Sequence, residues 1–346
     1  MINVLVCDDS TFMRRAITTM LSSDPKVNVV DTAKNGREAV ELAMKHRPDV
    51  ITLDVEMPEM DGLTALREIM AKCPTSVIML SSLTTEGSRA AMQALRLGAA
   101  DVLAKDQSQI STKIMSLQND LLSRVHALTE SKPVRTVPVK RETGTLNFRP
   151  GQFDLVVIGS STGGPPVLEK ILTRVPAGSR VPIVVAQHMP CVFTKSMAER
   201  LNTQCGVPVR HGDDKMPIEP GAVHIAPGGM NTHLRKAGSR LTMHVSRDPE
   251  GTVYYPSANV LFQTAAETCG KRVLAIVLTG MGDDGVRGAK VLADVGGVIL
   301  AQSAETCVVY GMPKAVTQSA LATESLSPEQ IGDVLARVTG AASRAA

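Results

Sequence analysis

Three short segments in the second half of the chain hold a serine, a histidine and an aspartate, the residue types of a hydrolytic triad. Each segment follows an apolar run and contains glycine or proline. The segments are residues 159–164 (GSSTGG), 187–190 (QHMP) and 280–285 (GMGDDG). In a triad, the serine attacks a carbonyl carbon, the histidine takes the serine proton, and the acid orients the imidazole. The pattern therefore predicts acyl transfer by a serine nucleophile.

The first segment matches the G-x-S-x-G elbow, in which a tight turn exposes a serine hydroxyl at a helix N-terminus. The match places Ser161 at its centre, and Ser160 is the alternative nucleophile. A phosphate or dinucleotide loop would need a GxGxxG pattern or a P-loop lysine, which this segment lacks. The chain order Ser, His, Asp differs from the Ser, Asp, His order of α/β-hydrolases, so the sequence disfavours a lipase-like origin.

The histidine and the acid each follow a predicted strand. His188 ends the run VPIVVAQ, and Asp284 comes after LAIVLTG with Asp283 as the competing acid. Side chains at the carboxyl ends of parallel strands face a common crevice, so the strand ends favour these residues. A lone histidine is more often structural, and six others compete: His46, His126, His211, His224, His233 and His244.

A second set of residues, in the first half of the chain, indicates a phosphate-accepting site. They follow four apolar runs and are Asp8, Asp9, Asp54, Ser81 and Lys105. Carboxylates that converge at one sheet edge repel one another unless a hard cation such as Mg²⁺ lies among them. Ser81 could hydrogen-bond a phosphoryl oxygen and Lys105 could neutralise its charge. Acids that only cap helices would explain Asp8 or Asp9, but not the whole set.

The elements that carry these residues predict two α/β domains. Residues 1–125 alternate five apolar runs with five helical patterns, which indicates a parallel sheet covered on both faces. Residues 126–152 are rich in proline and basic residues and predict an extended linker. The alternation resumes over 153–346 and predicts a second doubly wound, mainly parallel domain, with an antiparallel excursion at 220–256.

Composition narrows the class of protein. A chain of 346 residues with 43% hydrophobic and 21% charged residues suits two globular domains. No apolar run approaches the roughly 20 residues that span a bilayer, and the N-terminus lacks a basic leader segment. Six cysteines without a CxxC pair favour free thiols in a reducing cytoplasm. The net charge of +3, with its excess in the linker, and 2% aromatic residues argue against nucleic-acid binding.

Residues 1 to about 125 resemble the receiver domain of two-component response regulators, through DDS at 8–10, LDVEMP at 53–58, Ser81 and Lys105. The resemblance implies a flavodoxin-like five-stranded parallel sheet and phosphorylation of Asp54 by a chemotaxis histidine kinase. It also implies a Mg²⁺ site made by Asp8, Asp9, Asp54 and the backbone carbonyl of Glu56. Two positions depart from the family: Asp106 replaces the usual proline, and Val102 the frequent aromatic switch residue.

The three segments of the second half resemble the catalytic domain of CheB-type chemotaxis methylesterases. Together with the receiver, the resemblance spans essentially the whole chain. It implies Ser161, His188 and Asp284 as the triad and the Met281 backbone N–H as an oxyanion donor. It further implies hydrolysis of glutamyl methyl esters on methyl-accepting chemoreceptors, with release of methanol and no cofactor, and deamidation of receptor glutamines.

The predicted function is therefore a cytoplasmic methylesterase that phosphorylation of its own receiver activates. One alternative is a response regulator whose second domain only binds partners, which loss of a triad member would favour. Another is a DNA-binding regulator, which the charge distribution and the lack of a recognisable small helical effector domain disfavour.

Overall fold

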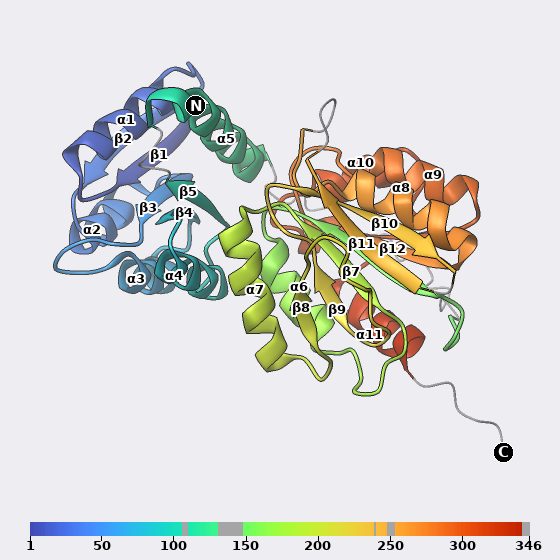
Figure 1. Cartoon of the computed structure of the whole chain (residues 1–346). Coiled ribbons are helices and arrows are strands. Elements are labelled where there is room, and N and C mark those ends of the chain that lie inside the picture. The colour runs from blue at the N-terminus through green and yellow to red at the C-terminus, as the bar shows by residue number, and fades with distance from the viewer. Residues whose placement is uncertain (106–109, 131–147, 239, 248–252, 341–346) are drawn as a thin grey trace. The chain divides into compact units, whose positions relative to one another are not determined.

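The computed structural model describes residues 1–105, 110–130, 148–238, 240–247 and 253–340 (Figure 1). The chain divides into two compact units, Met1–Lys132 and Pro133–Ala346. None of the helices in the described ranges is long and apolar enough to cross a membrane. The six cysteines are free.

The first unit alternates strands and helices. In chain order they are β1 (Ile2–Cys7), α1 (Thr11–Ser22), β2 (Val27–Ala33), α2 (Gly36–His46), β3 (Val50–Asp54), α3 (Gly62–Lys72), β4 (Ser76–Ser82), α4 (Thr85–Arg96), β5 (Asp101–Lys105) and α5 (Ile110–Glu130). The strands form one parallel sheet in the order β2-β1-β3-β4-β5. Helices α1 and α5 cover one face of the sheet, and α2, α3 and α4 cover the other (Figure 1). The predicted five-stranded parallel sheet, covered on both faces, is confirmed.

Helix α5 ends later than the predicted start of the linker at residue 126. It ends at Glu130, within what we predicted as the start of the linker, and residues 131–147 of that linker lie outside the described ranges. Its last turns are held because Val125 and Leu128 are buried. His126 of the same turns lies 2.6 Å from a carboxylate oxygen of Asp24, which follows α1.

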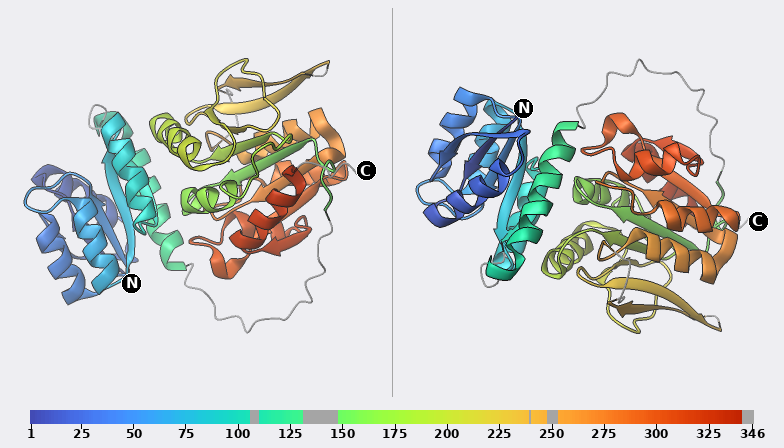
Figure 2. Two further views of the ribbon diagram at one scale, coloured as in Figure 1. Left: turned by 90° about the horizontal axis from the view of Figure 1, so that it is seen from below. Right: turned by 90° about the horizontal axis from the view of Figure 1, so that it is seen from above.

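The second unit is also a doubly wound α/β fold. Its strands and longer helices are β6 (Leu155–Ser160), α6 (Gly164–Leu172), β7 (Ile183–Gln187), α7 (Cys191–Gln204), β8 (Val209–His211), β9 (Val223–Ile225), β10 (Asn231–Ala237), β11 (Arg240–Ser246), α8 (Ala258–Cys269), β12 (Val273–Val277), α9 (Val286–Asp294), β13 (Val298–Gln302), α10 (Met312–Gln318), β14 (Glu324–Leu326) and α11 (Pro328–Thr339). Seven strands form a parallel sheet in the order β14-β13-β12-β6-β7-β9-β8. The antiparallel excursion is the separate hairpin of β10 and β11 (Figure 2), whereas β9 belongs to the main sheet.

The strand order places the three predicted catalytic segments at one edge of this sheet. Strand β6 lies in the centre, with β12 on one side and β7 on the other. The chain leaves β6 towards β7 and later returns to β12, so the carboxyl ends of these strands form a switch point, where α/β sheets bind ligands. The turns that follow the three strands contain Ser161, His188 and Asp284.

A close contact at Gly159 fixes how α8 crosses β6. A Cβ atom added to Gly159 would lie 2.6 Å from Cβ of Ala258 and 3.2 Å from the Phe262 ring, both on α8. Only glycine permits this approach. The contact brings the first turn of α8, whose N-cap is Ser257, over the carboxyl edge of the sheet.

We expect Gly159→Ala to lower the free energy of unfolding of the second unit by about 1–3 kcal/mol, because the added methyl group overpacks the contact with α8. Gly206→Ala is the matched control, since its added Cβ would meet neighbours only at 3.6 Å or more. Calorimetric melting of the full-length variants measures both effects. Equal melting temperatures for the two variants would show that α8 can move away from the added methyl group without loss of stability.

Candidate active site and phosphoacceptor site

The two adjacent serines of the nucleophile turn have different environments. Ser160 is fully buried, and its hydroxyl donates a 2.6 Å hydrogen bond to the side-chain carbonyl of Gln187. Ser161 is partly exposed, and its backbone N–H donates to the Thr279 carbonyl at 3.0 Å. The turn then reaches α6 through Gly163, whose φ of 76° is in the left-handed region that favours glycine. The geometry leaves the hydroxyl of Ser161, rather than that of Ser160, accessible to a substrate.

His188 and Asp284 meet across the switch point. The Nε2 atom of His188 lies 2.8 Å from Oδ2 of Asp284. Because the carboxylate can only accept, Nε2 carries the proton in the neutral ring and Nδ1 is the acceptor. Nδ1 is buried and has no hydrogen-bond partner among the described residues. This is the reverse of the serine-protease template, in which Nδ1 faces the acid and Nε2 faces the serine.

Asp284 is bound by the N-terminus of α8 as well as by His188. Its carboxylate accepts hydrogen bonds from the Ser257 hydroxyl (2.9 Å) and from the backbone N–H groups of Ala258 (2.6 Å) and Asn259 (3.0 Å). Burial by itself raises the pKa of Asp284, but the His188 contact and these N–H donors hold it below its usual value. The positive end of the helix adds to the same effect.

The structure separates Asp284 from the competing Asp283. Asp284 is 1% exposed and contacts the imidazole, whereas Asp283 is exposed on the same turn. Ser257 is the N-cap of α8, and nothing in the sequence indicated that this capped turn binds the acid. The one sequence feature that could have indicated this contact is the position of Ser257 directly before a helix that packs on the central strand.

Met281, the candidate oxyanion donor, follows a glycine that lies close to Ser161. A Cβ atom added to Gly280 would lie 2.7 Å from Cβ of Ser161. The turn is held in place because Gly280 N–H donates to the Val309 carbonyl, and the Gly280 carbonyl accepts from Gly311 and Met312. The Met281 backbone therefore lies one residue from the contact with Ser161.

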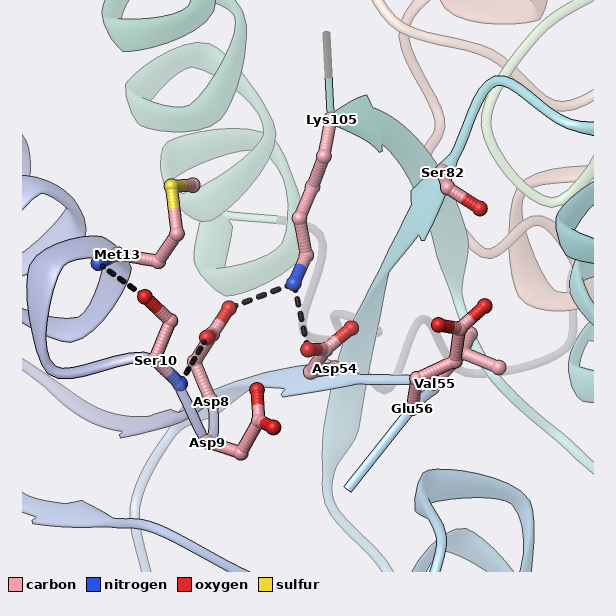
Figure 3. A pocket seen from close by; sticks show the side chains of 9 residues that line it. All are labelled: Asp8, Asp9, Ser10, Met13, Asp54, Val55, Glu56, Ser82 and Lys105. Carbon is pink, nitrogen blue, oxygen red and sulfur yellow. Dashed lines mark hydrogen bonds and ion pairs between the residues drawn. The ribbon is translucent and has the colours of Figure 1, made fainter. Parts of the chain in front are cut away.

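In the first unit, Lys105 joins two buried carboxylates at the carboxyl edge of the sheet (Figure 3). Its Nζ atom lies 2.6 Å from Oδ2 of Asp8 and 2.6 Å from Oδ2 of Asp54. One oxygen from each of Asp8, Asp9 and Asp54 lies within 4.8 Å of the others. Burial raises the pKa of Asp54 to about 6, against the lowering effect of Lys105. This cluster of hard oxygen donors fits Mg²⁺, and Glu56 lines the same pocket.

The structure does not bring Ser81 into this pocket. Its hydroxyl donates to the Gly87 carbonyl at 2.8 Å, and a phosphoryl contact would require the hydroxyl to leave that partner. Ser82 lines the pocket instead (Figure 3). The Ser82 hydroxyl lies 3.1 Å from Oγ1 of Thr84. Of the two departures from the receiver family, Val102 is buried, and Asp106 lies outside the described ranges.

Comparisons with known proteins agree with both halves of this picture. The family model described as CheB methylesterase matches residues 156–335, and that of the response regulator receiver domain matches residues 4–115. The chain is 45% identical to protein-glutamate methylesterase/protein-glutamine glutaminase 1 of Oleidesulfovibrio alaskensis, over 93% of this chain and 95% of that protein. It is 44% identical to the protein of the same enzyme name from Archaeoglobus fulgidus, over 91% of each.

A solved structure supports the fold of the second unit. The crystal structure of the Thermotoga maritima CheB methylesterase catalytic domain matches with a TM-score of 0.52 and 38% sequence identity, covering 53% of this chain and 97% of that one. Matches of this extent show that the chain belongs to the CheB methylesterase family, with a response regulator receiver domain in front of its catalytic domain.

Proposed function

We propose that this chain hydrolyses glutamyl methyl esters of methyl-accepting chemoreceptors in the cytoplasm, and deamidates receptor glutamines, with Ser161, His188 and Asp284 as its triad. The observation that carries the proposal is the 2.8 Å contact between His188 and a buried, donor-bound Asp284 beside the turn of Ser161. The enzyme names of the relatives support the substrate class. The alternative of a second domain that only binds partners leaves this contact without a role.

In the proposed mechanism, Oγ of Ser161 attacks the ester carbonyl carbon while its proton moves to Nδ1 of His188. Asp284 stabilises the imidazolium through Nε2, and the Met281 N–H stabilises the oxyanion. The intermediate then expels the methoxy group, which takes the proton from Nδ1 and leaves as methanol. Water, deprotonated by the same nitrogen, hydrolyses the glutamyl ester on Ser161 and restores the serine. With a glutamine substrate the leaving group is ammonia.

The receiver half supplies the proposed control. Asp54 would accept a phosphoryl group from the chemotaxis histidine kinase, and Asp8, Asp9 and the Glu56 carbonyl would hold Mg²⁺ with it. The cation would balance the charge of the carboxylates and the phosphoryl group. Lys105 already bridges Asp8 and Asp54 and would pair with the added charge.

We expect Ser161→Ala to lower turnover by roughly 10⁴- to 10⁶-fold without changing the melting temperature, because the attacking atom is lost. Ser160→Ala should keep turnover but lower stability by about 1–3 kcal/mol, since it leaves the Gln187 carbonyl unpartnered. Methanol release from methylated receptor membranes, beside a melting curve, measures both. The opposite pattern would make Ser160 the nucleophile.

Asp284→Asn should lower turnover by roughly 10⁴-fold, because an amide does not stabilise the imidazolium and presents donors to the N–H groups of α8. Asp283→Asn, on the exposed neighbour, should stay within a few-fold of the wild type. Steady-state rates on the same membranes rank the two variants. A larger loss for Asp283→Asn would mean that the wrong acid of the pair has been assigned.

A small-molecule phosphodonor with Mg²⁺ should raise the hydrolysis rate of the full-length protein by about 5- to 150-fold, the range of ordinary coupling energies. Asp54→Ala should keep the basal rate and abolish the response. EDTA should block activation and spare the basal rate, because the proposed triad residues are not metal ligands. Basal hydrolysis that EDTA removes, or activation that persists in Asp54→Ala, would contradict this assignment.

A further inference from the structure

The ring of Tyr254 lies flat on the imidazole of His188. The two ring centroids are 4.6 Å apart, and the planes differ by 6°. Tyr254 belongs to the short segment that enters α8, three residues before Ser257. One stretch of chain therefore contacts the histidine through an aromatic face and the orienting acid through a hydroxyl.

The far end of the Tyr254 ring lies against the turn that carries the acid. A Cβ atom added to Gly282 would be 2.5 Å from the Tyr254 hydroxyl oxygen and 3.4 Å from Cζ, and Gly282 has a φ of +80°. Any side chain at position 282 would be strained and would push the ring. The 280–285 turn thus leaves room for an aromatic residue that reaches from the imidazole to the backbone beside Met281.

We propose that Tyr254 is a positioning residue for His188, an inference that rests on the proposed role of His188 as the base. The stack restricts rotation of the imidazole about its side-chain bonds, so that Nε2 stays on Asp284 and Nδ1 stays free to accept the Ser161 proton. The electron-rich face of the tyrosine also favours the imidazolium that forms during the attack. Tyr254 acts through His188 and takes no part in bond making.

The titratable groups that the structure places against His188 are Asp284, through Nε2, and Tyr254, through the ring face. Asp283 of the same turn is exposed. Replacing Tyr254 by leucine keeps apolar cover over the imidazole but removes the π face. Since that face favours the charged ring, its loss makes the imidazolium less stable. The acid limb of kcat/KM, which reports the base in the free enzyme, then moves to lower pH.

The test is the pH profile of methanol release by phosphodonor-treated full-length protein, with the receiver unchanged in every variant. In Tyr254→Leu we expect the acid limb to move down by roughly half a unit to one and a half units, and kcat to fall roughly 3- to 30-fold. KM should stay within about twofold. Tyr254→Phe keeps the ring and should restore the wild-type limb. Val253→Ala, at the neighbouring 82% exposed side chain, is the control and should behave as wild type.

Three outcomes would overturn the proposal. One is a wild-type acid limb in Tyr254→Leu, even with a lower melting temperature, because the ring would then be only structural. Another is a Tyr254→Phe variant as impaired as Tyr254→Leu, which would assign the effect to the hydroxyl. The third is a loss that appears in KM alone. A separate variant tests the proposed function itself. If His188 is not the base, His188→Gln should keep its activity.

Discussion

The carboxylate of Asp284 lies at the positive end of α8, and the geometry of the catalytic half depends on this contact. A buried carboxylate is costly unless donors surround it. Here the Ser257 hydroxyl, two N–H groups of the first helical turn and His188 satisfy it together. Because both carboxylate oxygens accept hydrogen bonds from the N-terminus of α8, the imidazole can approach the carboxylate only from the side that these donors leave open. The helix therefore fixes the acid, and the acid fixes which nitrogen of His188 is left without a proton.

The position of α8 follows from the sheet beneath it. Gly159 has no side chain, so α8 approaches β6 closely enough for Ala258 and Phe262 to pack on the strand. The same strand runs directly into Ser160 and Ser161. Gly159 lies one residue before the end of β6. Its lack of a side chain brings the helix that binds Asp284 within reach of the turn that follows the strand.

The sequence predicted the residues that follow strands better than those brought in by packing. Ser161, His188 and Asp284 were predicted because a parallel sheet places its strand ends at one edge, and the structure places their segments at that edge. Asp8, Asp54 and Lys105 were predicted by the same rule. The contacts of Tyr254 with His188 and of Ser257 with Asp284 were not predicted, since they depend on where α8 lies. Ser81 shows a further limit, because the sequence does not reveal that its hydroxyl donates to the backbone carbonyl of Gly87 in α4.

Each of the two sites lies at the carboxyl edge of the sheet of its own unit, but the carboxylates have opposite environments in the two sites. In the first unit, Asp8, Asp9 and Asp54 crowd together with one lysine, and burial raises the pKa of Asp54 to about 6. Such a cluster carries excess negative charge, and the binding of a cation and then of a phosphoryl group would change its charge balance. In the second unit a single carboxylate is surrounded by donors, and its pKa is lowered. That carboxylate keeps its charge and its direction, as a fixed partner for the imidazole must. The receiver acids therefore suit a site that changes state, and Asp284 suits one that does not.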